Sequence, residues 1–292
     1  MTSDTPQNKE QKQSLDSSGP TLPGDEDEMV QLLWAQHSQL SELMSGVLPP
    51  LLDPSKGSRV LDIGWGTGGL VREMASKYPS VHITGIEANA SVVEKAQILI
   101  RGLSNATILV QDMHHLDDKV FPSASFDLIH MLFLAKDVPI QKFPPLLQSL
   151  VRICRPEGLL VWTEAEFPIT TSLACQRLCT MVQSGLQASG RAFSPGNSLG
   201  VTGRMSHWLG DAGCRITQNR IHAIDISAGS KGHEAFVRQV EISSGQIRTF
   251  LLKMGLTTVA ELEDVFLEMQ REIREEKFCG MLYLRTLVGV RL

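Results

Sequence analysis

The pattern of apolar and polar residues alternates along most of the chain between short apolar runs and helical stretches. From about residue 59 onward, apolar runs typical of buried strands are separated by segments with the 3.6-residue helical period. The predicted strands cover 60–63, 81–87, 106–110, 126–133, 159–164, 215–226 and about 281–290. This alternation predicts an α/β protein in which a mostly parallel sheet has helices on both faces.

Capping and helix-breaking residues predict where helices begin and end between these strands. Ser91-x-x-Glu94 has the form of a capping box, so a helix is expected to open there and to run to about Gly102. Pro144 to Cys154 forms another predicted helix, which Arg155-Pro156-Glu157-Gly158 ends before the fifth strand.

The first part of the chain lies outside this alternation. Residues 1–26 are polar and acidic, which predicts a disordered tail. Residues 27–54 are predicted to contain an amphipathic helix. That helix either packs on the edge of the domain or caps the cofactor site with Trp34, His37 or Ser41, whose spacing places them on one helix face.

The core is predicted over residues 55–166, and residues 167–292 combine the rest of the sheet with two helical insertions. These insertions, at about 167–210 and 231–277, are expected to form a lid over the substrate. Apolar side chains of the second insertion either face an apolar substrate or pack as an ordinary amphipathic core. The side chains concerned are Phe236, Val240, Phe250, Met254, Phe266 and Met269.

Composition and charge restrict the class of partner. The 292-residue chain has a formal net charge of −5, and residues 1–29 carry all of it with seven acidic and two basic side chains. The neutral remainder has no basic region suited to nucleic acid or to an anionic membrane surface. Because the chain shows no apolar run as long as a membrane span and no signal peptide, we expect a cytoplasmic protein. Its five cysteines, without a C-x-x-C pair, are expected to be reduced thiols.

The glycine-rich stretch that follows the first strand fits two ligand-binding patterns. The glycines fit the dinucleotide pattern G-x-G-x-x-G, in which Glu87 would bind a ribose. Together with Asp62 they also fit D-x-G-x-G-x-G, a pattern of proteins that bind S-adenosylmethionine (SAM). A carboxylate at the strand end would repel a pyrophosphate, whereas it would attract the ammonium and sulfonium groups of SAM. Asp62 therefore favours the second pattern. The residues that form it are Asp62, Gly64, Gly66 and Gly68.

With this motif and the segments that follow it, residues 55–165 resemble class I SAM-dependent methyltransferases, and most closely the UbiE-like small-molecule branch. The resemblance implies a Rossmann-like fold with a seven-stranded, mostly parallel sheet, whose last strand is antiparallel and lies beside the fifth. It implies SAM as the cofactor, with Glu87 on the ribose hydroxyls, Asp112 on the adenine amino group and Met113 against the adenine ring. The predicted cofactor-binding residues are Asp62, Gly64, Trp65, Gly66, Gly68, Glu87, Ala88, Asp112, Met113 and His130.

Two positions depart from the pattern of that family. Trp65 stands in the loop where relatives usually have a small residue, so its indole is expected to pack over the cofactor or to alter the mouth of the pocket. Met131-Leu132 stands where relatives often have an Ala-Arg pair, so a function that depends on that arginine is not carried over to this chain.

Three residues are candidates for catalysis. His130, at the carboxyl end of the fourth strand, is expected where an acceptor would meet the methyl group, and it either takes a proton there or only shapes the pocket. Glu164 and Glu166, two positions apart at the end of the fifth strand, either bind a substrate amine or proton, or are solvated or helix-capping carboxylates. No metal site is predicted, because His114-His115 has no visible third ligand.

These features predict a SAM-dependent methyltransferase that acts at O, N or C of a small, partly apolar metabolite by in-line displacement. One alternative is a SAM-binding protein that transfers no methyl group, either a cyclase-like catalyst or a regulatory subunit. A methyltransferase of RNA or protein and a nucleotide-dependent dehydrogenase are less favoured alternatives. The sequence leaves open whether the protein forms a homodimer.

Overall fold

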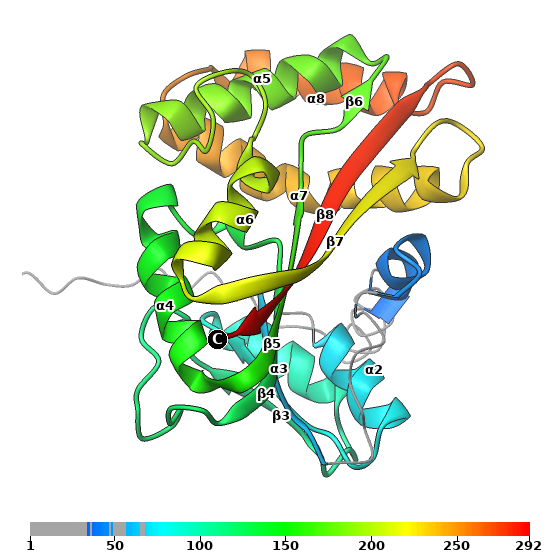
Figure 1. Ribbon diagram of the computed structural model, residues 1–292. Helices are drawn as coiled ribbons and strands as arrows, with labels where there is room; N and C mark the ends of the chain where they lie inside the picture. Colours follow the sequence, from blue (N-terminus) through cyan, green and yellow to red (C-terminus); the bar gives the residue numbers. More distant parts are fainter. Residues whose placement is uncertain (1–33, 36, 47, 49–56, 65–67) are drawn as a thin grey trace, which may run out of the picture.

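The computed structural model describes residues 34–35, 37–46, 48, 57–64 and 68–292 (Figure 1). The tail predicted over residues 1–26 therefore lies outside the described residues. So do parts of the helix predicted within 27–54. Trp65, Gly66 and Thr67 of the glycine-rich loop also lie outside them.

A mixed sheet of eight strands organises the described part of the chain, in the order β3-β2-β1-β4-β5-β8-β6, with β7 paired to β8. The parallel strands are β1 (Arg59–Gly64), β2 (His82–Glu87), β3 (Ala106–Val110), β4 (Phe126–Leu132) and β5 (Cys154–Ala165). The strand β8 (Gly280–Arg291) runs antiparallel beside β5, as expected. It pairs also with β7 (Cys214–Asp225) and with a two-residue strand that was not predicted, β6 (Ile169–Thr170).

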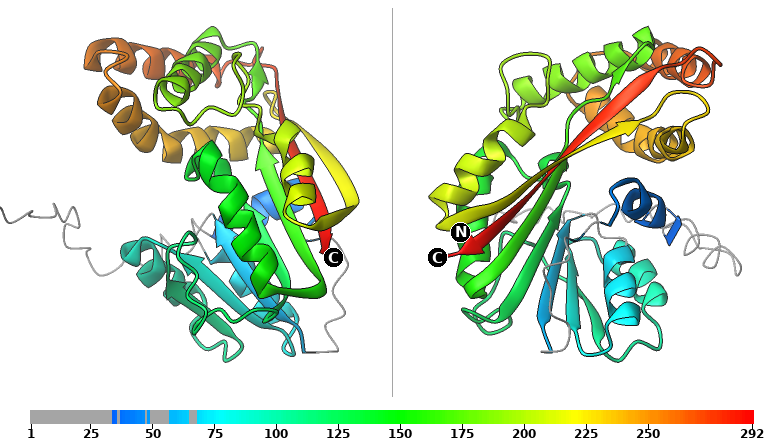
Figure 2. Two further views of the ribbon diagram at one scale, coloured as in Figure 1. Left: turned by 60° about the vertical axis from the view of Figure 1, so that its left-hand side comes forward. Right: turned by 45° about the vertical axis from the view of Figure 1, so that its right-hand side comes forward.

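Helices cover both faces of this sheet (Figure 2). On one face lie α2 (Gly69–Lys77) and α3 (Ala90–Leu99), whose buried side chains share a core with Val60 and Leu128. On the other face lie α4 (Phe143–Ile153) and α6 (Val201–Asp211), whose core includes Leu61 and Ile129. Because both faces are covered, successive residues of β1 and β4 are buried, which explains why these strands are apolar without alternation.

The upper helical layer in Figure 1 consists of α5 (Leu173–Ala188), α7 (Lys231–Lys253) and α8 (Val259–Glu272), which pack on one another. Phe266 and Met269 are fully buried within this layer, so these two side chains form an ordinary amphipathic core. Val240, Phe250 and Met254 are only half-buried.

The first predicted insertion, 167–210, divides between two places in the molecule. Its first helix, α5, joins the upper layer, whereas α6 packs on the sheet beside α4. The reason is an aromatic cluster: the ring of Trp208 in α6 stacks on Phe143 at 4.9 Å between centroids, and Trp162 of β5 stacks on Phe143 at 5.3 Å. Burial of these large rings holds α6 on the sheet and away from the upper helical layer.

One helix start differs from the prediction. The N-cap of α3 is Asn89, whose side-chain oxygen accepts the backbone N–H of Ser91 at 3.0 Å, so Ser91 lies inside the helix. Asn89 has an extended backbone at the end of the turn after β2, which is the conformation that an N-cap needs. Another helix start is capped by Thr258, whose Oγ1 accepts the N–H of Glu261 at the start of α8.

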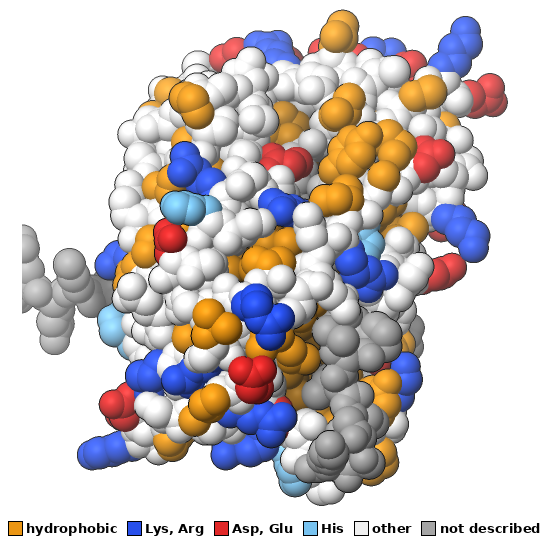
Figure 3. All heavy atoms as spheres, viewed as in Figure 1, with side chains coloured by type: hydrophobic (Ala, Val, Ile, Leu, Met, Phe, Trp, Pro, Cys, Tyr) orange, Lys and Arg blue, Asp and Glu red, His pale blue; other side chains and the backbone are white. Residues whose placement is uncertain are grey.

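The outer surface seen in Figure 3 mixes acidic, basic and apolar side chains. Apolar side chains gather there over the upper part of β7 and β8, where Ile221 and Tyr283 are exposed. In the part of the chain that the structure describes, no helix has the length and the apolar character needed to cross a bilayer.

Candidate functional site

The predicted site residues come from the carboxyl ends of four adjacent parallel strands. Asp62 of β1 pairs in register with His130 of β4 on one side and with Gly85 of β2 on the other. Glu87 ends β2, and Asp112 follows β3. This edge of an open α/β sheet is where such folds bind their ligands.

The backbone at the end of β1 requires glycine at two described positions. Gly64 has φ +118°, and a Cβ there would lie 2.2 Å from the carbonyl oxygen of Leu132 in β4. Gly68, the N-cap of α2, has φ +67°, and a Cβ there would lie 2.9 Å from Cδ1 of Ile108. Both φ values fall in the region that favours glycine. The loop therefore starts and ends on backbone that only glycine fits, and Trp65 and Gly66 between them lie outside the described residues.

The helical residues 37–43 pack directly against the start of α2. A Cβ at Gly69 would lie 2.4 Å from the Cβ of His37, so the two helices are in close contact. Nε2 of His37 is 2.6 Å from Oε2 of Glu73, and this hydrogen bond lowers the pKa of Glu73. The contact anchors the helix at the start of α2 and is compatible with both alternatives, packing on the domain and capping of the cofactor site.

Asp62 and His130 form a buried pair across β1 and β4. Oδ1 of Asp62 lies 2.8 Å from Nδ1 of His130, and the His130 side chain is 1% exposed. Nε2 of His130 is buried and has no hydrogen-bond partner among the described residues. No described residue hydrogen-bonds Oδ2 of Asp62, whose side chain is 19% exposed. Within the described part of the chain, the pair thus leaves one imidazole nitrogen and one carboxylate oxygen without a hydrogen-bond partner.

Glu87 and Ala88 lie at the open end of β2. Oε1 of Glu87 accepts the backbone N–H of Asn89 at 2.9 Å, which fixes the carboxylate at the strand end. Ala88 is exposed, and Glu87 is half-buried. The carboxylate is therefore held in place while it remains reachable by a ligand, which is what a predicted contact with ribose hydroxyls requires.

Asp112 is held by its own loop. Its Oδ1 accepts the backbone N–H of His114 at 2.9 Å, and its Oδ2 lies 2.8 Å from Nδ1 of His115. These bonds, the one from the backbone foremost, lower the pKa of Asp112, so the carboxylate stays ionised at neutral pH. Met113 is half-buried and packs against the core under α4. Both residues lie at the same edge of the sheet as Glu87.

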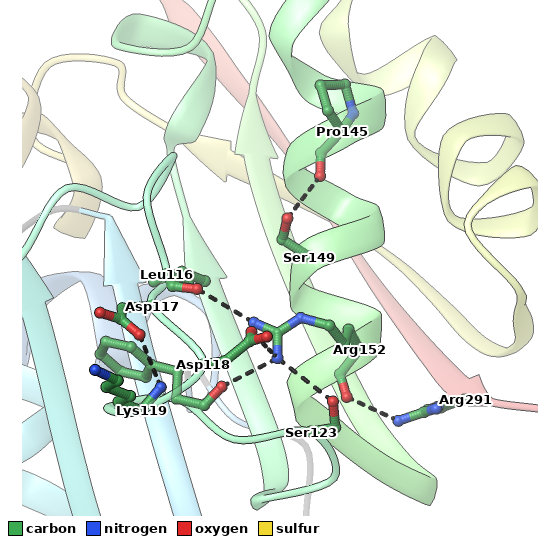
Figure 4. A network of polar contacts seen from close by, with 10 residues as sticks. Leu116, Asp117, Asp118, Lys119, Ser123, Pro145, Ser149, Arg152 and Arg291 are labelled. Carbon is green, nitrogen blue, oxygen red and sulfur yellow. Dashed lines mark hydrogen bonds and ion pairs between the residues drawn. The ribbon is translucent and has the colours of Figure 1, made fainter.

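The loop that carries Asp112 and Met113 is fastened to α4 by Arg152 (Figure 4). The guanidinium donates to the carbonyl oxygens of Leu116 and Phe121, each at 3.2 Å, and pairs with Asp118 at 2.8 Å. Its position thus determines the course of the segment between β3 and β4.

Glu164 is buried below the turn that follows β4. Its Oε1 accepts the backbone N–H groups of Leu134 and Ala135, at 2.7 and 3.2 Å, and the indole N–H of Trp162 at 2.9 Å. Burial raises its pKa to about 8, although these donors act in the opposite direction. The turn begins at Phe133, whose φ of +53° is left-handed. Glu164 therefore holds a strained turn beside the carboxyl end of β4.

Glu166 lies beyond the end of β5 and caps α6. Its Oε2 accepts the N–H of Gly200 at 2.7 Å, and its Oε1 accepts the N–H and the hydroxyl of Thr202 at 3.0 and 2.6 Å. Glu164 and Glu166 thus bind the main chain of different elements. The helix-capping alternative describes the position of Glu166.

The sequence did not predict that Asp62 and His130 belong to a longer row of polar side chains on the sheet. Counting alternate residues from Val60, Leu128 and Val161 places Asp62, His130 and Thr163 on the same face. Oγ1 of Thr163 is 2.8 Å from Oγ1 of Thr286 in β8, and Oγ1 of Thr286 is 3.2 Å from Nε2 of His222 in β7.

The signal that could have found this row is a polar residue inside an apolar strand, because such a residue needs a partner when it is buried. Thr163 is fully buried and Thr286 is 2% exposed. The pKa of His222 is lowered by burial and by Arg220.

Metal-ligating side chains do not cluster in the described residues: no group of three His, Cys, Asp or Glu side chains could hold an ion there. The five cysteines are free, and three of them are buried.

The comparison with protein families matches residues 60–158 to a methyltransferase domain. This segment runs from β1 to the first residues of β5. It includes Asp62, Glu87, Asp112 and His130.

Some related sequences match only part of this chain, and at least one matches most of it. The cyclopropane-fatty-acyl-phospholipid synthase of Escherichia coli (strain K12) is 35% identical over 105 residues, which cover 36% of this chain and 25% of the synthase. The chain therefore spans about a quarter of the length of that relative. The methyltransferase str2 of Strobilurus tenacellus is 23% identical over 256 residues, which cover 85% of this chain and 88% of that protein.

Among solved structures, the chain is similar to the [4+2]-cyclase SpnF. The match covers 94% of this chain and 99% of the SpnF chain, with a TM-score of 0.50 and 18% sequence identity. At that identity the likeness is one of fold. The strand order, the glycine-dependent bend after β1 and the family match agree with one another. Residues 60–158, from β1 to the start of β5, are therefore similar to a methyltransferase domain, and the described part of the chain has the α/β fold of the matched structures.

Proposed function

We propose that this protein transfers the methyl group of SAM to O, N or C of a small, partly apolar molecule, as UbiE-like small-molecule methyltransferases do. The observation that carries the proposal is the ligand-facing edge of the methyltransferase domain. There the backbone at Gly64 leaves no room for a Cβ, and the Asp62–His130 pair has polar atoms to spare.

The residues at this edge fit SAM by their chemistry. Oδ2 of Asp62, which no described residue hydrogen-bonds, suits a ligand that brings positive charge. Glu87 suits vicinal hydroxyls, and Asp112 with Met113 suits an amino-bearing aromatic ring. We propose that these residues hold the methionine end, the ribose and the adenine of SAM in that order. When bound, SAM supplies a methyl group on a positively charged sulfur.

The protein's own part in the reaction is alignment and exclusion of water. Asp62 orients His130 at the end of β4, and the turn after β4 is fixed by Glu164. Glu166 fixes α6. We propose that Glu164 and Glu166 support the site through these main-chain contacts, and that His130 is the residue nearest the reacting atoms.

The acceptor is proposed to enter between the sheet and the upper helical layer. Half-buried apolar side chains of α7 and the segment after it, Val240, Phe250 and Met254, suit a partly apolar molecule. The neutral charge of the chain outside residues 1–29 favours such a molecule over nucleic acid.

Calorimetry with SAM and with S-adenosylhomocysteine, its demethylated product, tests the cofactor part of the proposal. We expect saturable binding of both, which Glu87→Gln weakens by roughly tenfold or more because a charged acceptor is lost. Glu94→Gln, an exposed change on α3, is the matched control and should leave binding unaltered. Absence of binding to either compound would refute the proposal.

Transfer of a labelled methyl group distinguishes the proposed function from the cyclase-like or regulatory alternative. Methyl-labelled SAM is incubated with a panel of small phenols, carboxylic acids, amines and alkenes, together with a bulk RNA sample. Label in a small molecule supports the proposal. Label in RNA alone, or bound SAM that never transfers its label, favours one of the alternatives.

A further inference from the structure

The Asp62–His130 pair determines which nitrogen of the imidazole is available to a ligand. A carboxylate oxygen accepts a hydrogen bond, so Nδ1 of His130 is the N–H donor in the 2.8 Å contact with Asp62. In the neutral imidazole the other nitrogen, Nε2, then carries a lone pair and no hydrogen. The pair therefore presents a hydrogen-bond acceptor at Nε2.

Nε2 of His130 is buried, and none of the described residues forms a hydrogen bond with it. The His130 side chain is 1% exposed. A buried polar atom left unpaired is costly, and native proteins keep such atoms mainly where a ligand or a water completes them. Since His130 sits in a central strand between β1 and β5, its ring cannot swing out to find another partner.

The position of the pair makes the substrate that receives the methyl group the most suitable ligand for Nε2. Asp62 keeps a second oxygen for a positively charged group, so the cofactor's ammonium has a stronger partner than a neutral nitrogen. A carboxylate hydrogen-bonded to the far nitrogen of an imidazole is the arrangement that orients a general base and stabilises the imidazolium formed when it takes a proton.

We infer that Nε2 of His130 accepts the proton of a hydroxyl group on the substrate, so that this enzyme is an O-methyltransferase. The inference rests on the proposed function. As the bond between the hydroxyl oxygen and the methyl carbon forms, the bond from that carbon to sulfur breaks, and its electron pair stays on sulfur as a neutral thioether. The hydroxyl proton passes to Nε2, and the resulting imidazolium is stabilised by the Asp62 carboxylate.

Nitrogen-15 NMR of the labelled, full-length protein tests the first step without any substrate. The neutral His130 ring is expected to carry its hydrogen on Nδ1 and none on Nε2, and Asp62→Asn is expected to change this signal. His207→Gln, a change at an exposed histidine of α6, is the matched control and should leave the His130 signal unaltered. A hydrogen on Nε2 in the wild-type protein overturns the inference, whatever the protein does with SAM.

Kinetics and binding test the second step. His130→Gln is expected to lower kcat for hydroxyl acceptors by about 100-fold or more, with the KM for SAM and the affinity for S-adenosylhomocysteine changed less than about threefold. A loss of cofactor affinity on the scale of the loss in kcat would instead make His130 a cofactor ligand. Label found in amines or carbon acceptors, with none in phenols or carboxylic acids, would also overturn the inference.

Two outcomes separate this inference from the proposed function. If the wild-type protein binds neither SAM nor its product, the proposed function fails and the inference, which depends on it, fails too. If binding and transfer occur but the proton lies on Nε2 or the label enters no oxygen acceptor, only the inference fails. Because the NMR measurement uses the wild-type chain, it decides the matter even if His130→Gln does not fold.

Discussion

A single buried carboxyl group, Glu164, shows how a local interaction can depend on the whole fold. Its oxygen satisfies three N–H donors from two elements, one of them a turn with left-handed backbone at Phe133. Sequence alone identified Glu164 as a polar residue at the end of an apolar strand. The donors could not be predicted, because they come from a turn about thirty positions away whose path depends on the sheet.

The raised pKa of Glu164 predicts how stability changes with pH. Below the ordinary value of 4.5 the group is protonated in both states, so its contribution to folding is fully present. As the pH rises toward 8, the unfolded chain ionises and the folded one resists, so this contribution is lost. We expect Glu164→Gln, which keeps the accepting oxygen without a charge, to remove that loss in urea unfolding measured at pH 5, 6.5 and 8.5.

Glu164→Ala is the contrasting variant, because it removes the acceptor altogether. Three N–H groups would lose their partner, at a cost of roughly 3 kcal/mol or more in the free energy of unfolding. Glu268→Gln, on the exposed side of α8, serves as the surface control. A wild-type stability that does not fall between pH 5 and 8.5 more than that of Glu164→Gln would contradict the assigned cause.

Gly64 gives a second prediction at the scale of one residue. We expect Gly64→Ala to lower the free energy of unfolding by roughly 2–3 kcal/mol or more, because its Cβ would meet the Leu132 carbonyl at 2.2 Å and φ is +118°. Gly203→Ala is the matched control: the site is exposed in α6, and a Cβ there meets nothing within 4 Å. That change should be neutral or stabilising by up to about 1 kcal/mol in the same unfolding experiment.

At the scale of whole elements, local patterns predicted the strands well and the packing of helices less well. The predicted strand at 106–110 coincides with β3. The predicted strand at 126–133 differs from β4 by one residue, because burial of β4 on both faces leaves a strong apolar signal. The start of α3 was wrong because Asn89 and Ser91 both suit an N-cap, and only the turn geometry after β2 decides between them. The place of α6 depended on stacking between Phe143 and Trp208, which no local pattern reveals.

The loop between β3 and β4 yields a prediction at this scale. Arg152→Ala removes the hydrogen bonds to Leu116 and Phe121 and the pair with Asp118, at a cost of roughly 1–3 kcal/mol. Because the loop carries Asp112, we also expect weaker SAM binding and faster amide hydrogen exchange over residues 111–121. Arg101→Ala, an exposed change beyond α3, is the control. Unchanged exchange in this loop would show that Arg152 does not hold it.

For the whole molecule, the edge of the sheet that forms the site was predictable, whereas the contacts between distant segments were not. Asp62, Glu87 and Asp112 could be placed together because parallel strands end at one edge. The pairing of Asp62 with His130 required the neighbours of β1 and the side-chain directions, and the family resemblance implied only the place of the last strand. The contact of His37 with α2 joins residues far apart in sequence, and sequence could offer it only as one of two alternatives.

The first described helix is joined to the rest of the protein by a partly buried hydrogen bond and by an exposed ion pair, and we expect their removal to have unequal effects. His37→Ala removes a buried side chain that contacts Gly69 and Glu73, so we expect a loss of roughly 1–3 kcal/mol in the free energy of unfolding. Lys231→Ala breaks only the exposed pair with Glu42, at 3.5 Å, and should cost less than about 1 kcal/mol. Equal losses in chemical unfolding would show that the helix is held by its surface charges.

The antiparallel strand β8 lies between β5 and β7, and hydrogen bonds join it to both. On the ribosome, β5 and β7 are made well before β8, and until residues 280–291 emerge each of them has an open edge where β8 will pair. A nascent chain at that stage therefore exposes strand edges that favour pairing with another chain.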